Sequence, residues 1–251
     1  MSFHDGTGAA SARSDGTPEP QERDENAAAE IHAAADPALS EDLALALLNR
    51  PDLPPEALEA LSKNGSVIRN RKVRRGVVGH PKTPRHVSVP LLRHLYTFDL
   101  MQVALTPIVP ADVKRAAEEI LANKLGSISS GERLTLARRA SPRIAGELLV
   151  DKEARVMQAA LDNSRLTEAL VVKAVVRQDA PGRLVETVCH HAKWSVRREV
   201  RIALLRCEKT PLARALEFAR ALPPPLVREI LRNSRLPAST KAYITRELDQ
   251  R

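Results

Sequence analysis

Aromatic residues are scarce in this chain of 251 residues: Phe, Tyr and Trp together make up 2%, and Trp194 is the single tryptophan. A thick globular core usually draws much of its buried area from aromatic rings. Because 43% of the residues are nevertheless hydrophobic, the apolar surface must come mainly from Leu, Val, Ile and Ala. This composition favours thin layers of closely packed helices.

Cysteines and long apolar runs are also lacking. Cys189 and Cys207 are the only cysteines, which is no disulfide framework. No run reaches the roughly 18 consecutive apolar residues that indicate a membrane-spanning helix. The first residues have neither the basic start nor the apolar stretch of a secretory signal. We therefore expect a cytoplasmic protein that does not associate with a membrane.

Motifs of catalysis and metal binding are missing as well. The sequence contains no G-x-S-x-G elbow, P-loop or H-E-x-x-H motif. Cys189, His190 and His191 are adjacent, but neighbouring residues on a helix point about 100° apart and converge poorly on one ion. Neither a C-x2-C pair nor a histidine pair at i, i+4 is present. We expect no metal, no cofactor and no enzymatic activity.

Acidic charge is concentrated near the N-terminus. Residues 1–42 contain ten Asp and Glu against two Arg, whereas the rest of the chain carries a net charge of +16. Residues 1–38 are rich in small and acidic residues, which predicts a disordered tail, although a short helix around "ENAAAEIHAAA" is an alternative. The ordered domain is expected at 39–251, with Ser40 as a helix cap. The tail either competes with an acidic partner for the basic body or only improves solubility.

A short phrase recurs along the ordered part of the chain, as "LLNRPDLPPEAL", "VVGHPKTPRHV", "VALTPIVPADV", "LARRASPRIAG", "ALDNSRLTEAL" and "ILRNSRLPAST". In each copy one position, usually a proline, marks the predicted start of the next helix. It falls at Pro54, Pro84, Pro110, Pro142 and Thr167, and again at Pro211 and Pro237. In these phrases Thr83, Ser141 and Thr210 are predicted to cap a helix whose first residue is the following proline. The repeat length is then 25 to 32 residues.

Each repeat contains two short amphipathic helices. In "WSVRREVRIALLR" the apolar face consists of Val196, Val200, Ala203 and Leu204, and in "EARVMQAAL" it consists of Val156, Ala160 and Leu161. A helix pair repeated at this period is typical of a helical solenoid, in which each pair stacks on its neighbour. The sequence therefore predicts an all-α fold, an α-α superhelix of short antiparallel helix pairs.

The phrase "VRRGVVGHPKTP" at residues 73–84 resembles the leucine-rich repeat variant, a bacterial relative of HEAT-like repeats. "LLNRPDLPPEAL" and "LRNSRLPAST" resemble the same motif more weakly. The resemblance implies a right-handed superhelix that serves as a binding scaffold. One founding member of that family carries an iron–sulfur cluster on a cysteine-rich segment, which this chain lacks, so the resemblance implies no cofactor here.

Two basic clusters and the tryptophan are the candidate partner-binding residues. They are Arg71, Arg74 and Arg75 on one predicted helix face, Arg197, Arg198 and Arg201 on another, and Trp194 between two basic residues. If equivalent repeat positions line up, the arginines form a continuous stripe suited to phosphate backbones. Alternatively they are solvated or paired with acids in adjacent repeats. Trp194 either stacks on a base or, as we favour, fills a packing gap.

Two functions remain open at this point. The first is a non-enzymatic scaffold that binds a protein or peptide partner, of acidic character, through the solenoid surface. The second is sequence-nonspecific nucleic-acid binding through the arginine-rich groove. A HEAT-like DNA glycosylase is a third and weaker interpretation, because the chain has so few aromatic residues. The sequence leaves the oligomeric state open.

Overall fold

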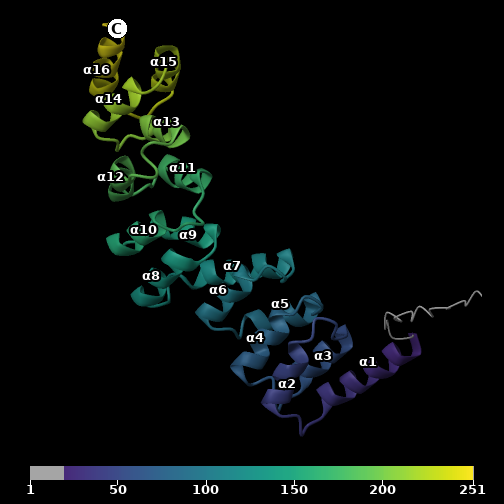
Figure 1. Cartoon of the computed structure of the whole chain (residues 1–251). Helices are drawn as coiled ribbons and strands as arrows, with labels where there is room; N and C mark the ends of the chain where they lie inside the picture. The colour runs from purple at the N-terminus through teal and green to yellow at the C-terminus, as the bar shows by residue number, and fades with distance from the viewer. Residues whose placement is uncertain (1–19, 251) are drawn as a thin grey trace, which may run out of the picture. The chain divides into compact units, whose positions relative to one another are not determined.

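The computed structural model of the chain describes residues 20–250, and every regular element in that range is an α-helix. This confirms the predicted all-α class. The chain divides into two compact units at Pro84 and Arg85, where the sequence predicted one ordered domain. Each unit is described by itself. The unit up to Pro84 contains α1 (Pro20–Ala35), α2 (Glu41–Leu48), α3 (Pro55–Lys63) and α4 (Arg71–Gly79) (Figure 1).

The unit from Arg85 onward contains the other twelve helices of the described residues. They are α5 (Arg85–Leu92), α6 (Thr97–Leu105), α7 (Ala111–Lys124), α8 (Ser130–Arg139), α9 (Pro142–Leu148), α10 (Ala154–Leu161), α11 (Glu168–Val176), α12 (Gly182–His190), α13 (Arg198–Arg206), α14 (Leu212–Arg220), α15 (Pro224–Arg232) and α16 (Ala238–Asp249).

Helices in both units pack against the helix two positions away in the chain. In the first unit α1 contacts α3, and α2 contacts α4. In the second unit α5, α7, α9, α11, α13 and α15 form one row through successive contacts, while α8, α10 and α12 form another. Figure 1 shows these two rows in the unit from Arg85 onward. The result is a set of short helices packed in local pairs, as a helical repeat requires.

The core is made of the aliphatic residues that the periodicity predicted. Val156, Ala160 and Leu161 on α10 are fully buried. The face predicted from "WSVRREVRIALLR" is right for its last three members but wrong for Val196, which is 60% exposed because α13 begins only at Arg198. None of the described helices is long and apolar enough to cross a membrane.

Side chains at one helix end bind carbonyl groups at the end of the helix two elements earlier, and we call these contacts the rungs. His80 Nε2 lies 2.9 Å from Arg50 O, and Lys82 Nζ donates to Asp52 O at 2.8 Å. Lys209 Nζ likewise donates to Ala180 O. These acceptors lie in the loops just after α2 and α11, where the helical ladder no longer supplies donors, so each rung adds a donor to a loop carbonyl and joins two successive turns.

The threonine of the repeated phrase acts on the helix before it. Thr83 Oγ1 donates to Val77 O at 2.5 Å, and Thr210 Oγ1 donates to Leu204 O at 2.6 Å. Both threonines are buried. The prediction that these hydroxyls cap the following helix is wrong, because α5 begins only at Arg85 and α14 only at Leu212, with Pro211 as its N-cap, so each threonine stands one position before the cap. Each hydroxyl instead donates its proton to a carbonyl near the end of the preceding helix.

Helix starts follow the prediction in part. Ser40 caps α2 by accepting from Leu43 N, as expected. Ser141 is the N-cap of α9 and Pro142 its first residue, but Ser141 makes no side-chain cap bond. The remaining prolines of the pattern mostly stand one position earlier than predicted, because the extended N-cap conformation also suits the fixed φ of proline. Pro54, Pro110, Pro211 and Pro237 are all N-cap residues.

Substituting Thr83 with valine tests the backward hydroxyl bond. Valine keeps the shape but removes the shorter of the two hydrogen bonds to Val77 O and leaves only the longer one, at 3.4 Å from His80 N, so the free energy of unfolding should fall by about 1 kcal/mol. Thr83→Ser keeps the hydroxyl and is the matched control. Urea denaturation of the full chain measures both, and equal stability of the two variants would contradict the assigned bond.

Helix α1 replaces part of the predicted disordered tail. It packs on α3, Ala34 is fully buried, and Asn64 Nδ2 donates to Ala34 O at 3.0 Å. The helix agrees with the alternative of a short helix around "ENAAAEIHAAA", where an alanine-rich segment favours helix and α3 supplies a surface to pack on. Residues 1–19 of the predicted tail lie outside the described residues. Seven of the ten acids in residues 1–42 belong to the described part.

Candidate functional site

The first predicted arginine group lies on α4. Arg71 is exposed, whereas Arg74 and Arg75 are half-buried, opposite the buried valines of that helix. Arg74 Nη2 donates to Arg69 O at 3.2 Å, and all three arginines take part in further interactions. None of the three side chains is therefore free of contacts within the fold.

The second predicted group lies at the start of α13. Arg197 is the N-cap and Arg198 the first helical residue, and both side chains are exposed. Arg201 is half-buried, and its Nε donates to Ser195 O at 2.8 Å. The two arginine groups lie in different units, so the predicted stripe that joins them stays a prediction.

Trp194 lies in the core beneath the loop between α12 and α13. Its ring is 2% exposed, and Nε1 donates to Leu161 O at 2.8 Å. Lys193 Nζ covers the ring at 4.2 Å from the centroid. This placement agrees with the packing interpretation, and in this conformation the ring offers no open face to a partner.

Rungs bring three loops of the second unit side by side. They are the loops that follow α8, α10 and α12. Asn163 Nδ2 donates to Ala137 O at 2.8 Å, and Arg165 Nη1 donates to Arg139 O at 3.2 Å, which joins the second loop to the first. The Trp194 bond to Leu161, together with His191 Nε2 at 3.1 Å from Asp162 Oδ1, joins the third loop to the second.

Exposed basic side chains gather at these three loops. We call the set the cationic edge; it consists of Arg138, Arg139, Arg143, Arg165, Lys193, Arg197 and Arg198. Among the described residues, none of these seven side chains forms an ion pair with an acid. The whole unit from Arg85 onward contains 29 Lys and Arg against 18 Asp and Glu, so the edge lies on a basic body.

Acids at the same loops are fewer and partly engaged. Asp162 is bound by His191. Glu168 is half-buried in the first turn of α11, and Glu199 is exposed in the first turn of α13. Seven cations thus face three carboxylates, which leaves the edge a net source of positive potential.

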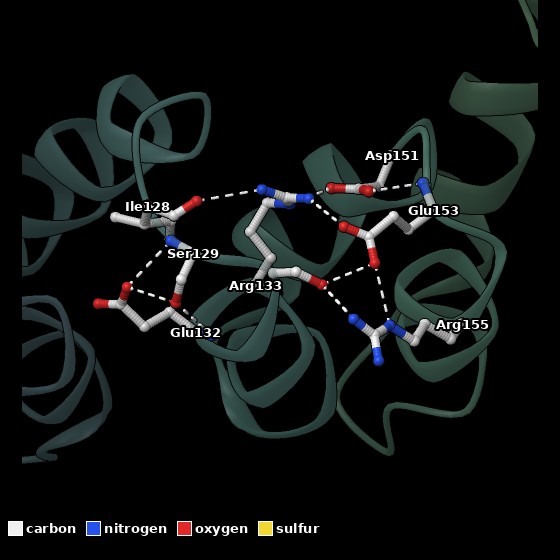
Figure 2. A network of polar contacts seen from close by, with 8 residues as sticks. Ile128, Ser129, Glu132, Arg133, Asp151, Glu153 and Arg155 are labelled. Carbon is white, nitrogen blue, oxygen red and sulfur yellow. Dashed lines mark hydrogen bonds and ion pairs between the residues drawn. The ribbon is translucent and has the colours of Figure 1, made fainter.

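The loops at the other ends of these helices are different, because their charges are mostly paired. Figure 2 shows the main example, in which Arg133 on α8 points toward Asp151 and Glu153 of the loop between α9 and α10. Arg133 Nε donates to Asp151 Oδ2 at 2.8 Å, and Nη2 donates to Glu153 Oε1 at 2.7 Å. Its third nitrogen donates to Ile128 O at 3.1 Å. Each of the three guanidinium nitrogens thus donates a hydrogen bond, and together these bonds join the loop before α8 to the loop between α9 and α10.

Glu153 is the centre of this polar network. Its Oε2 accepts from Ser130 Oγ at 2.6 Å and from Arg155 Nε at 2.9 Å. The Ser130 hydrogen bond, the Arg155 hydrogen bond and the nearby positive charges lower the pKa of Glu153 below its usual range. Arg177 and Asp179 form a further pair at 2.7 Å. These loops therefore carry little unbalanced charge, in contrast with the cationic edge.

Five residues of the cationic edge were missed from the sequence, among them Lys193, which directly precedes Trp194. Arg138, Arg139 and Arg143 belong to "LARRASPRIAG", and Arg165 belongs to "ALDNSRLTEAL". Both phrases were recognised as repeat turns, and their arginines were the available signal. The sequence prediction selected dense basic runs, whereas the basic residues of the edge come from separate turns of the repeat.

Cys189 and the potential metal ligands were the remaining chemical candidates of the sequence. Cys189 is fully buried, and burial raises the pKa of its thiol to about 12, so it stays protonated near neutral pH. Over the described residues, no three His, Cys, Asp or Glu side chains lie together as metal ligands.

Comparisons with protein-family models, with curated proteins and with solved structures found no match to this chain.

Proposed function

We propose that this chain is a non-enzymatic helical-repeat scaffold, a solenoid of the leucine-rich repeat variant or HEAT-like kind, which binds an anionic macromolecule along the cationic edge. An acidic protein or peptide and a nucleic acid are the two partner classes that such a surface accepts. The observation that carries the proposal is the set of seven exposed cations on three adjacent loops, none paired with an acid among the described residues.

The cations of this edge are informative because they are gathered on three adjacent loops with few acids, whereas several arginines at the other ends of the same helices are paired. At the other ends of the same helices, Arg133, Arg155 and Arg177 are each bound to carboxylates. Like charges on neighbouring loops repel one another, and a bound anion removes that repulsion while it gains charge-assisted hydrogen bonds. The edge is therefore better suited to an anionic partner than to bare solvent.

The helix rungs support a scaffold role for the repeat. Each loop of the edge is fixed to its neighbour by side-chain bonds to helix-end carbonyls, such as Asn163 to Ala137 and Trp194 to Leu161. A surface held in this way is preorganised, so a partner does not have to order the loops when it binds. The support for the proposal is thus both charge and rigidity.

Fluorescence anisotropy across a salt series tests the proposal. The full chain is titrated into a labelled polyglutamate peptide and into labelled random-sequence duplex DNA, between about 50 and 200 mM salt. Binding of at least one probe, with an affinity that falls as salt rises, is the expected result. Failure of both probes to bind at low salt would overturn the proposal.

A further inference from the structure

We infer that the partner of the cationic edge is a nucleic-acid duplex, held through its phosphate backbone without readout of base sequence. This inference rests on the proposed function and names the partner class for that surface. It depends on three observations: the edge has few exposed apolar side chains, its cations match the spacing of phosphates, and Trp194 is buried.

The edge lacks the apolar centre of a protein interface. Stable protein interfaces bury a core enriched in aromatic side chains and Met, with polar groups at the rim. At the three loops, Ala140, Leu166 and Trp194 are buried in the fold, and Val196 is the large apolar side chain left exposed. Interfaces with nucleic acid are more polar and much more positively charged. The composition of the edge therefore favours a phosphate backbone over an acidic protein surface.

The number of cations fits the charge density of a duplex. Packed helices lie about 8–10 Å apart, so three successive loops extend over about 20 Å. Along that length each strand of a duplex presents about six phosphates. Six of the seven cations are arginines, whose planar fork binds phosphate oxygens in pairs. One strand of a duplex can thus be matched along the whole edge.

The position of Trp194 favours a duplex over a single strand. Proteins that hold single strands usually stack bases on exposed aromatic rings. The only tryptophan is committed to the core, and its Nε1 to Leu161 O. No Phe, Tyr or Trp is exposed in the described residues of the three loops. A surface that offers charge without stacking recognises the outside of a duplex.

The test compares two charge-matched variants in the full chain. The edge variant carries Arg138→Gln, Arg143→Gln, Arg197→Gln and Arg198→Gln, four exposed residues with no side-chain bonds in the described part of the chain. The control variant carries Lys173→Gln, Arg183→Gln, Arg232→Gln and Arg246→Gln, which are also exposed and lie away from the three loops. Both lose four positive charges, so net charge alone cannot distinguish them.

Each variant is titrated into labelled random-sequence duplexes and into polyglutamate across the salt series. The edge variant should bind the duplex about tenfold or more weaker than the control variant, and its salt slope should fall by about 0.9 for each phosphate that is no longer neutralised. Two unrelated duplex sequences should bind equally well. Circular dichroism verifies that each variant is folded. If the quadruple variant is unstable, the double variants Arg138→Gln/Arg143→Gln and Arg197→Gln/Arg198→Gln are titrated in its place, and each should bind the duplex more weakly than wild type.

Three outcomes overturn the inference. Equal duplex binding by the edge and control variants would remove the edge as the site. Binding of polyglutamate but not of duplex, abolished in the edge variant, would overturn the inference and leave the proposed function standing. Absence of binding to every probe would overturn both.

Discussion

Replacement of Trp194 with alanine is expected to lower the free energy of unfolding by about 3–5 kcal/mol. The ring is 2% exposed, so alanine leaves a cavity between α10 and α12. The substitution also removes the hydrogen bond from Trp194 Nε1 to Leu161 O. This bond is the rung that joins the third loop of the cationic edge to the second. Urea denaturation followed by far-UV circular dichroism measures the change.

Trp194→Phe is the control for this prediction. Phenylalanine keeps much of the ring volume but has no N–H, so it isolates the cost of the unpaired Leu161 carbonyl, about 1–2 kcal/mol. The alanine variant should therefore be clearly less stable than the phenylalanine variant. Equal losses of stability in the two variants would mean that the hydrogen bond, and not the buried ring, stabilises this loop.

Substitution of Arg133 with methionine is expected to cost about 3–5 kcal/mol, because it leaves buried negative charge without its partner. Asp151 and Arg133 are both less than a tenth exposed, and the guanidinium also binds Ile128 O. The loop between α9 and α10 should then be attached to α8 mainly by the hydrogen bond from Ser130 Oγ to Glu153. Urea denaturation again gives the value, and protection of the loop amides against hydrogen exchange should fall in parallel.

Arg155→Met is the matched control, since it removes an exposed arginine from the same network. Its ion pair with Glu153 is largely solvated, and such pairs contribute about 0–1 kcal/mol. The double variant Arg133→Met/Asp151→Leu should recover part of the loss of stability, because it removes the unpaired charge. A loss for Arg155→Met as large as for Arg133→Met would contradict the central position of Arg133.

The same network adds a dependence on pH. Because the pKa of Glu153 is lowered in the folded protein, its stabilising contribution is present above the ordinary glutamate range. It disappears as pH falls through the lowered pKa of the folded state. Wild-type protein should therefore lose more stability on acidification than Glu153→Gln.

The sequence predicted the helices better than it predicted their contacts. The Ser40 cap and the buried face of α10 follow from spacing along one chain segment, which periodicity reports directly. The Thr83 hydrogen bond does not, because spacing along the chain shows roughly where a helix begins but not which carbonyl a hydroxyl donates to. The sequence offered a helix at α1 only as an alternative to disorder, because the choice depends on burial of Ala34 against α3.

The candidate site was only partly predictable for a related reason. Arg197 and Arg198 stand in a visible basic run, but Arg138 and Arg165 belong to separate repeats and meet only because loops two helices apart lie together. That adjacency is a property of packing. The hydrogen bonds of Asn163 and Trp194 to helix-end carbonyls hold these loops next to one another.

The rungs also make the length of the molecule adjustable. At several helix ends a side chain donates to a carbonyl two elements earlier, so an added pair of helices would bring its own donors and find its acceptors in the pair before it. His80, Asn163 and Lys209 perform this task with three different side chains, so the junction tolerates sequence drift after duplication. A chain built this way can gain or lose whole helix pairs over evolutionary time without redesign of its interior.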